Sequence, residues 1–406
     1  MKNRMQTLLA LIVAAVGLLM AVLLGLFAYM SATVKPLHPD PNRVPSAADP
    51  VGAPQWAASV ERARQVIRAG LTEQSLPALS VAVGIGGEIV WAEGFGWADL
   101  DNQVPVAPDT RFRIGTASIA LTSAAVGLLV EQNRLKLDEK IQTYVPEFPE
   151  KQWPVTLRHL MGHVAGVRND GGDEGPLLGR RCERTVDGLE AFGGRALLFE
   201  PGTQYRFSSY AWILVSAAVE TAAGEPLPAF MRKQIFEPLA MRDTKPDSST
   251  DPVPKRATPY FPRYGADPRY GLHVMRPVDY SCYAGASVFV STPSDLVRFA
   301  MAVGGGELLQ PATVQLLHTP QRLSSGAETG YGLGWDVETV TIAGRETRWI
   351  GHDGTSLGGK VASLMIFPEH RIAVALASNI SYADTAGLGV KVAEAFAGQG
   401  GRPSGR

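Results

Sequence analysis

Two pairs of strand-like segments, one near each end of the chain, constrain the fold more than any other feature of the sequence. Residues 79–94 contain two β-type runs joined by a Gly-Gly pair, and residues 361–378 contain two more joined by Pro-Glu-His. Such runs around a short turn are typical of β-hairpins. Roughly 260 residues with a mostly helical and loop-rich pattern separate the two hairpins. We therefore expect an α/β (α+β) fold, in which both ends of the chain build one antiparallel sheet that is flanked by helices, and in which a helical lobe is inserted.

The first 34 residues have the composition of a membrane anchor. Lys2 and Arg4 precede a nearly unbroken apolar run at residues 8–30, which is long enough to span a bilayer because a helix needs ~20 apolar residues. A cleaved signal peptide, whose apolar core has roughly 7 to 15 residues, is the alternative. The positive-inside rule keeps the basic end in the cytoplasm. We thus expect a single-pass protein of the inner (plasma) membrane whose domain faces the periplasm or the extracellular side, or a secreted protein if the segment is cleaved.

The remainder of the chain divides into a spacer, one domain and a tail. Residues 35–53 contain five prolines (residues 36–50) among small and polar residues, a composition that predicts an extended linker without a core. Residues 54–397 are expected to form the domain, which opens with a helical pattern and closes with a helix at 385–397. Residues 398–406 are expected to be disordered.

Charge and cysteine usage limit the partners. The formal net charge is -1, so the chain lacks the basic field that a nucleic-acid partner would require. We find no cofactor motif and no metal motif, because His159 and His163 stand four residues apart without the glutamate of a metalloprotease or a third ligand. Cys182 and Cys282 could form a disulfide on the outer side of the membrane or remain two buried thiols. The sequence does not specify the oligomeric state.

Several short stretches together resemble the serine β-lactamase and penicillin-binding-protein family, in particular the serine hydrolases related to class C β-lactamases. They occur in the family's order: FRIGTASIALTS at 112–123, LRHLMGH at 157–163, FEPGTQYRFSS at 199–209, YGLGW at 331–335 and HDG at 352–354. The resemblance covers roughly residues 55–397. It implies the family's fold and an acyl-transfer site.

The family's first motif, Ser-x-x-Lys, aligns with Thr116 and Ile119 when the chain is placed on Gly115. In the family, the serine attacks an acyl carbon, and the lysine on the same helical face accepts the serine proton. Thr116 keeps a hydroxyl, but its branched Cβ crowds the line of attack. Ile119 accepts no proton, and residues 114–130 contain no titratable side chain. A shift to Ser118 as nucleophile would place Leu121 at the lysine position, which is no better.

Of the other two motifs, the second has lost its functional groups and the third is retained. Phe207 and Ser209 replace the tyrosine and asparagine of Tyr-x-Asn, so the proton shuttle is also missing. The third motif is retained at 352–354, where His352 and Gly354 match His-x-Gly. The resemblance implies that the backbone N–H groups of Thr116 and Thr355 face each other as oxyanion donors.

These residues predict a pseudoenzyme: a membrane-anchored, extracytoplasmic domain that binds a peptide, cell-wall or acyl ligand in its cleft without turnover. One alternative is a slow esterase, peptidase or β-lactamase that uses Thr116 and borrows a base, for example His352 through a water molecule. A second alternative is a structural or signalling ectodomain with a vestigial cleft. Residues 8–30 would contact the lipid bilayer in each case.

Overall fold

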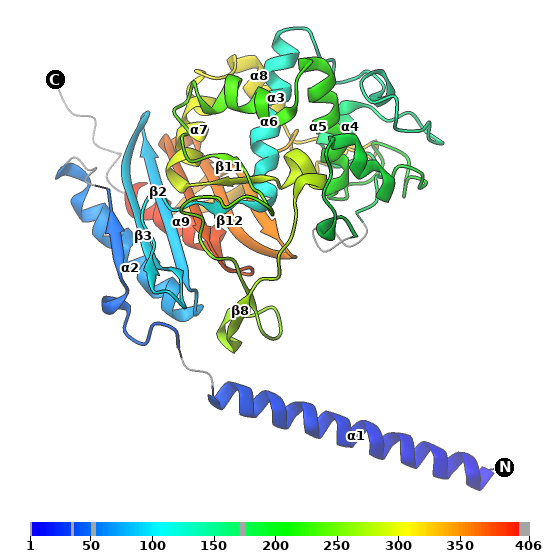
Figure 1. The fold of residues 1–406 in the computed structure, drawn as a ribbon, viewed down its shortest axis with the longest axis vertical. Coiled ribbons are helices and arrows are strands. Elements are labelled where there is room, and N and C mark those ends of the chain that lie inside the picture. The colour runs from blue at the N-terminus through cyan, green and yellow to red at the C-terminus, as the bar shows by residue number, and fades with distance from the viewer. Residues whose placement is uncertain (1, 34–35, 50–53, 170–175, 398–406) are drawn as a thin grey trace.

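The computed structural model describes residues 2–33, 36–49, 54–169 and 176–397 of the chain (Figure 1). The predicted disordered tail, 398–406, lies outside the described residues. One large sheet runs through the domain, and its strands all pair with antiparallel neighbours. In spatial order the strands are β1 (Ser46–Ala48), β3 (Glu88–Asp99), β2 (Ala78–Ile85), β13 (Ile372–Ser378), β12 (Gly359–Phe367), β11 (Arg345–Ser356) and β10 (Asp336–Ile342), with β4 (Val104–Pro105) paired to β3.

The predicted fold is confirmed. The hairpins β2–β3 and β12–β13 come from opposite ends of the sequence. All of β13 pairs with β2, from Ile85 opposite Ile372 to Leu79 opposite Ser378. The two ends of the chain therefore meet at the β2–β13 pair in one sheet, and the helical lobe is inserted between them in the sequence.

Helices cover both faces of the sheet, and the strand sequences show why. Alternate residues of a strand point to opposite faces. In β2 and β13 the larger side chains Val81, Val83, Val374 and Leu376 belong to the core beneath α2 (Ala57–Glu73) and α9 (Thr385–Ala397). The alanines between them belong to the other core, where their small size lets α7 (Pro293–Gly305) pack closely on the sheet.

The helical lobe consists of two largely buried helices surrounded by short elements. The buried pair is α3 (Ser118–Glu131) and α5 (Ser209–Ala223), and the shorter helices are α4 (Leu157–Met161), α6 (Leu227–Met231) and α8 (Pro311–His318). Small strand pairs border the lobe: β5 (Phe112–Arg113) and β6 (Lys245–Pro246) flank β9 (Phe289–Ser291), and β7 (Tyr260–Pro262) pairs with β8 (Leu272–Val274). Cys182 and Cys282 are joined by a disulfide, with their Cα atoms 4.9 Å apart.

The segment predicted as an extended linker without a core packs partly on the domain. β1 lies within it and pairs with β3, and Val44 and His38 are buried; an imidazole nitrogen of His38 forms a 3.0 Å hydrogen bond to the Leu76 carbonyl. The physical reason is that β3 would otherwise be an open sheet edge, and covering such an edge satisfies its backbone groups. Before this segment, α1 (Lys2–Thr33) is a continuous helix whose residues Arg4–Thr33 are long and apolar enough to cross a membrane.

Candidate functional site

The start of the buried helix α3 touches the sheet at the third motif. A 3-10 turn, η3 (Gly115–Ala117), precedes α3 and packs against β11. The approach is so close that a Cβ atom at Gly115 would overlap the Thr355 carbonyl, and a Cβ atom at Gly354 would overlap the Ile114 carbonyl. Gly115 also has a positive φ of 51°, which favours glycine. The two glycines therefore let the first and third motifs meet through their backbones.

The Thr116 hydroxyl is held by two backbone groups of β11. It accepts a hydrogen bond of 2.9 Å from the Thr355 N–H and donates one of 3.1 Å to the Asp353 carbonyl. Residues two apart on a strand direct their backbone groups to the same side, so Asp353 and Thr355 can bind one hydroxyl together. Thr116 is only 1% exposed. The Thr355 N–H, which the resemblance implies as an oxyanion donor, is bonded to the hydroxyl at the nucleophile position in this structure.

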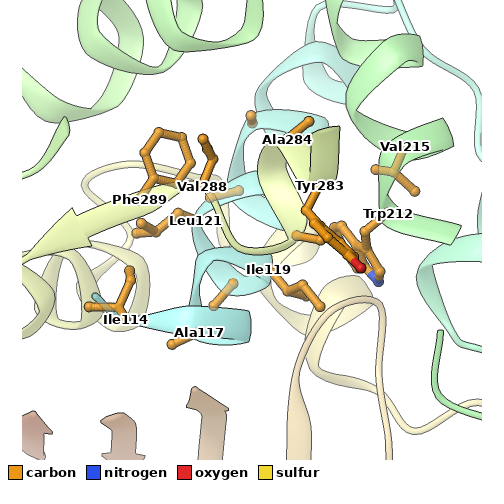
Figure 2. Close-up of a cluster of buried hydrophobic side chains, with 14 of the residues drawn as sticks. Ile114, Ala117, Ile119, Leu121, Trp212, Val215, Tyr283, Ala284, Val288 and Phe289 are labelled. Carbon is orange, nitrogen blue, oxygen red and sulfur yellow. The ribbon is translucent and has the colours of Figure 1, made fainter. Parts of the chain in front are cut away.

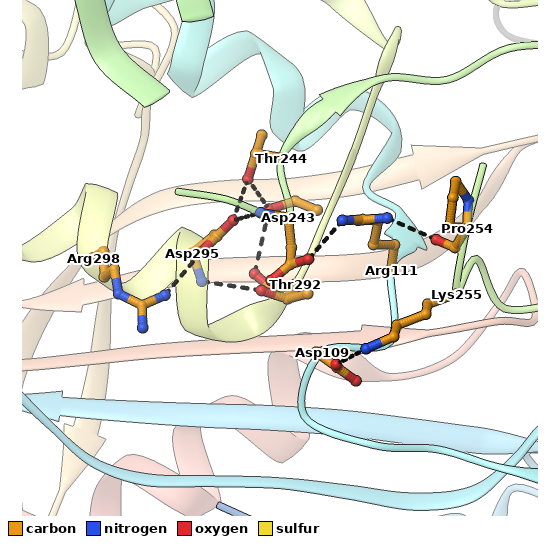
Figure 3. A network of polar contacts seen from close by, with 10 residues as sticks. Asp109, Arg111, Asp243, Thr244, Pro254, Lys255, Thr292, Asp295 and Arg298 are labelled. Atoms are coloured by element: carbon orange, nitrogen blue, oxygen red, sulfur yellow. Dashed lines mark hydrogen bonds and ion pairs between the residues drawn. The ribbon is translucent and has the colours of Figure 1, made fainter. Parts of the chain in front are cut away.

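Ile119 is a core residue. Its side chain is fully buried in a cluster that includes Trp212 and Tyr283, and Figure 2 shows the three side chains gathered beside the first turns of α3. None of the side chains that Figure 2 labels around Ile119 carries a charge that could pair with a lysine ammonium. The helix that carries Thr116 therefore offers a hydrocarbon side chain where the family places its base.

The second motif lies next to the third, but without the phenol and amide groups that the family has there. The Phe207 ring centroid is 6.4 Å from that of His352. Ser208 caps α5 by accepting a 3.2 Å hydrogen bond from the Ala211 N–H, and Ser209 is the first residue of the helix, where its N–H donates to the Asn169 side chain at 3.0 Å. The family's arrangement is kept, while the phenol oxygen that would carry protons is absent from it.

His352 has both ring nitrogens engaged. Nδ1 lies 2.6 Å from the Asp353 carbonyl, and Nε2 lies 2.9 Å from the Tyr331 hydroxyl. A carbonyl only accepts, so Nδ1 carries the proton, and in the neutral ring Nε2 accepts from Tyr331. Burial raises the pKa of Tyr331 well above its ordinary value, which keeps this phenol protonated as the donor. Use of His352 as a borrowed base would require breaking the bond to Tyr331.

His163 forms the centre of an aromatic cluster. Its Nδ1 accepts a 3.1 Å hydrogen bond from the Ser208 N–H, and burial lowers its pKa well below the ordinary value, so the ring is neutral. The rings around it are those of Tyr205, Phe207, Trp212 and Tyr331. His159 and His163, which stand four residues apart in the sequence, do not share a helix, because α4 ends at Met161 and His163 has a φ of 56°.

Sequence reasoning missed the roles of Tyr331 and His163. Tyr331 stands in the YGLGW stretch that contributed to the resemblance, but nothing in its sequence spacing indicated a bond to a histidine 21 residues later. The half-buried Asp336 was also missed; desolvation raises the pKa of its carboxyl group, while the nearby His352 opposes that rise.

Comparisons with known proteins agree with this geometry. The family model Beta-lactamase matches residues 63–397. The chain is 26% identical over 421 residues to the bovine serine beta-lactamase-like protein LACTB, mitochondrial, covering 80% of this chain and 74% of that protein. It is 26% identical over 315 residues to penicillin-binding protein 4* of Bacillus subtilis, covering 74% and 67%.

Two solved structures show the same fold. EstCE1, a hydrolase with promiscuous acyltransferase activity, matches with a TM-score of 0.70 at 22% identity over 83% of this chain and 98% of that one. The D-amino acid amidase from Ochrobactrum anthropi SV3 matches with a TM-score of 0.70 at 23% identity and the same coverage. With its sheet, its inserted lobe and the three motif positions in the family's order, this chain belongs to the β-lactamase family.

Proposed function

We propose that this chain is a membrane-anchored, extracytoplasmic β-lactamase-family domain that binds a peptide, cell-wall or acyl ligand without hydrolysing it. The observation that carries the proposal is the state of Thr116, whose hydroxyl is bonded between the Thr355 N–H and the Asp353 carbonyl. Nucleophilic attack requires a base to accept the hydroxyl proton. Ile119 cannot accept a proton, and the Asp353 carbonyl is not basic enough to do so.

The rate contributions of the missing base and proton shuttle are large enough to support inactivity. A positioned general base typically contributes ~10²- to 10⁴-fold to the rate. The shuttle at Phe207 is missing as well, and groups that act as a unit fail non-additively, so what remains is binding and backbone stabilisation of charge. Because Thr355 already donates to Thr116, an incoming carbonyl oxygen would also have to displace the hydroxyl from this donor.

The proposed location rests on α1 and on the disulfide. Residues Arg4–Thr33 have the length and composition of a membrane span, and Arg4 stands at their beginning. The Cys182–Cys282 bond favours an oxidising compartment, since disulfides rarely persist in the cytosol. The mammalian relatives carry mitochondrial names, so protease protection of this chain in its own cells is the direct test of orientation.

A binding role is favoured over a purely structural one by the aromatic cluster. Tyr205 is 39% exposed, and its ring lies 5.9 Å from that of Tyr331, which in turn bonds to His352. The cluster around the motif positions therefore reaches the surface through a large side chain with a hydroxyl group. Aromatic residues with a polar end are well suited to contact a ligand.

Three measurements on the full-length protein in detergent test the proposal. We expect no turnover of a chromogenic cephalosporin or of short nitrophenyl esters, no covalent adduct on Thr116 by mass spectrometry after penicillin treatment, and a raised melting temperature with peptides that end in D-alanine. Turnover that Thr116→Val abolishes would refute the proposal and establish the slow hydrolase. Absence of both turnover and any thermal shift would favour the structural ectodomain.

A repair series tests whether the motif assignment is right. We expect Thr116→Ser with Ile119→Lys to remain inactive, because Phe207 still lacks a hydroxyl. Adding Phe207→Tyr and Ser209→Asn should give measurable ester hydrolysis, since the ring at 207 already lies beside His352. Equal activity of the double and quadruple variants would show that the second motif has been misassigned.

A further inference from the structure

The hairpin β7–β8 projects from the domain on the side where α1 lies (Figure 1). Its base is held firmly: the buried Tyr260 hydroxyl accepts a 2.9 Å hydrogen bond from the Leu100 N–H, and the Tyr260 N–H donates to the Asn379 carbonyl at 2.7 Å. The hairpin is thus a fixed projection of the body and not a loose loop.

The hairpin exposes aromatic, apolar and basic side chains together. Tyr264 is 49% exposed and Val274 is 51% exposed, which makes them two of the four large hydrophobic residues that are exposed in the described chain outside α1. Residues 260–276 contain three arginines and a single acid, Asp267. Asp267 pairs with Arg269 at 2.7 Å, whereas Arg263 and Arg276, both exposed, form no ion pair within the described parts of the chain.

The tip of the hairpin contacts the apolar helix near its outer end. The ring centroids of Tyr270 and Phe27 lie 5.7 Å apart. Phe27 precedes Met30, the last residue of the apolar run, by three positions, which corresponds to ~4.5 Å along a helix. Tyr270 therefore lies beside the outer end of the apolar run, and tyrosine is enriched at the boundary between hydrocarbon and headgroups in membrane proteins.

We infer that the β7–β8 hairpin docks on the surface of the bilayer that holds α1, with Tyr264 and Tyr270 in the interface and with Arg263 and Arg276 on acidic phospholipid headgroups. This inference rests on the anchoring role of α1 proposed above. The hairpin would give the domain a second attachment point besides α1. Two attachments fix which side of the domain faces the membrane.

The test uses full-length protein in proteoliposomes. The two natural cysteines are bonded to each other, so Tyr264→Cys supplies a single free thiol for an environment-sensitive fluorophore. Gln315→Cys is the matched control, since Gln315 is exposed on α8, at the opposite end of the domain from β8 in Figure 1. The quenchers are lipids that carry a doxyl group near the headgroup, and flotation in a density gradient reports whether α1 is inserted.

We expect the label at 264 to be quenched by the doxyl lipids and the label at 315 to remain in water. Phosphatidylglycerol in phosphatidylcholine vesicles should strengthen the effect, and replacing Arg263 and Arg276 by glutamine should weaken docking on acidic vesicles by about fivefold per arginine. Flotation combined with equal, weak quenching at both positions would overturn the hairpin inference alone. Loss of flotation would overturn the proposed anchor and this inference with it.

Discussion

Thr116→Val separates a structural threonine from a catalytic one. Valine keeps the branched shape of threonine and replaces only the hydroxyl by a methyl group. The change removes the two hydrogen bonds to β11 and leaves the Thr355 N–H and the Asp353 carbonyl without their partner. At a working nucleophile the same change would abolish activity, whereas here we expect it to act on the free energy of unfolding alone.

The contacts give the size of the loss. A typical intramolecular hydrogen bond contributes ~0.5–1.5 kcal/mol, and a buried group left unpaired costs ~1–3 kcal/mol. Thr116 is buried, but Asp353 and Thr355 are only partly buried, so water can partly replace the lost partner. We therefore expect the free energy of unfolding to fall by about 2 kcal/mol, toward the lower end of these values. With ~2.1 cal/mol/K per residue, a domain of roughly 340 residues unfolds with an entropy of ~0.7 kcal/mol/K, so the melting temperature should fall by ~3 °C.

Urea unfolding followed by circular dichroism is the assay, with Thr116→Ser as the matched control. Serine keeps the hydroxyl and loses only a methyl group, so it should cost ~1 kcal/mol or less. The valine variant should therefore be clearly the less stable of the two. If the Thr116→Val variant were as stable as the natural chain and no less stable than Thr116→Ser, the hydroxyl would not be held by β11. That result would refute the reasoning.

Three further predictions concern the core, the disulfide and pH. Ile119→Lys should destabilise the fold by several kcal/mol, because it buries an ammonium among apolar side chains, whereas the volume-conserving control Ile119→Met should cost less than ~1.5 kcal/mol in urea unfolding. Replacing Cys182 and Cys282 by serine opens a loop with a sequence separation of 100 residues and should cost up to ~4.7 kcal/mol by chain entropy, measured against the oxidised protein. Burial lowers the pKa of His318 from 6.5 to about 4. Between these two pH values the imidazole is protonated in the unfolded chain and neutral in the folded chain, so the free energy of unfolding should fall as the pH drops from 6.5 to about 4. His318→Gln should reduce that slope in unfolding curves measured across this range, and replacement of the exposed His273 by glutamine should leave it unchanged.

The two terminal hairpins were predictable because their signal is local. Alternating or continuous β-type runs around a short turn appear directly in the sequence, and the pairing of β2 with β13 follows from the need to bury both hairpins. The β10–β11 hairpin was missed, although it turns at Ala343 and Gly344. Both of its strands carry many exposed polar residues, so they have no clear apolar pattern.

The candidate site was predictable by position but not by contact. Alignment on Gly115 placed Thr116 and Ile119, yet the bond from the Thr355 N–H to the Thr116 hydroxyl depends on how closely the turn before α3 packs on β11, which no local pattern in the sequence indicates. The pairing of β1 with β3 was not predicted either, because the proline-rich composition of that segment indicated an extended linker without a core. Long-range hydrogen bonds are set by the arrangement of elements, which no single segment encodes.

The substitutions at the motif positions support one another physically. With Ile119 buried among aromatic side chains, a hydroxyl at position 116 would find no side-chain partner on its own helix, and a buried hydroxyl without a partner is costly. Threonine has a stiff χ1, and here its oxygen is bonded to the backbone of β11. The residue that would attack substrate in an active relative therefore joins the helical lobe to the sheet in this chain. That linkage explains why restoring a serine alone should weaken the protein without activating it, and why activity should return only when base, shuttle and nucleophile are replaced together.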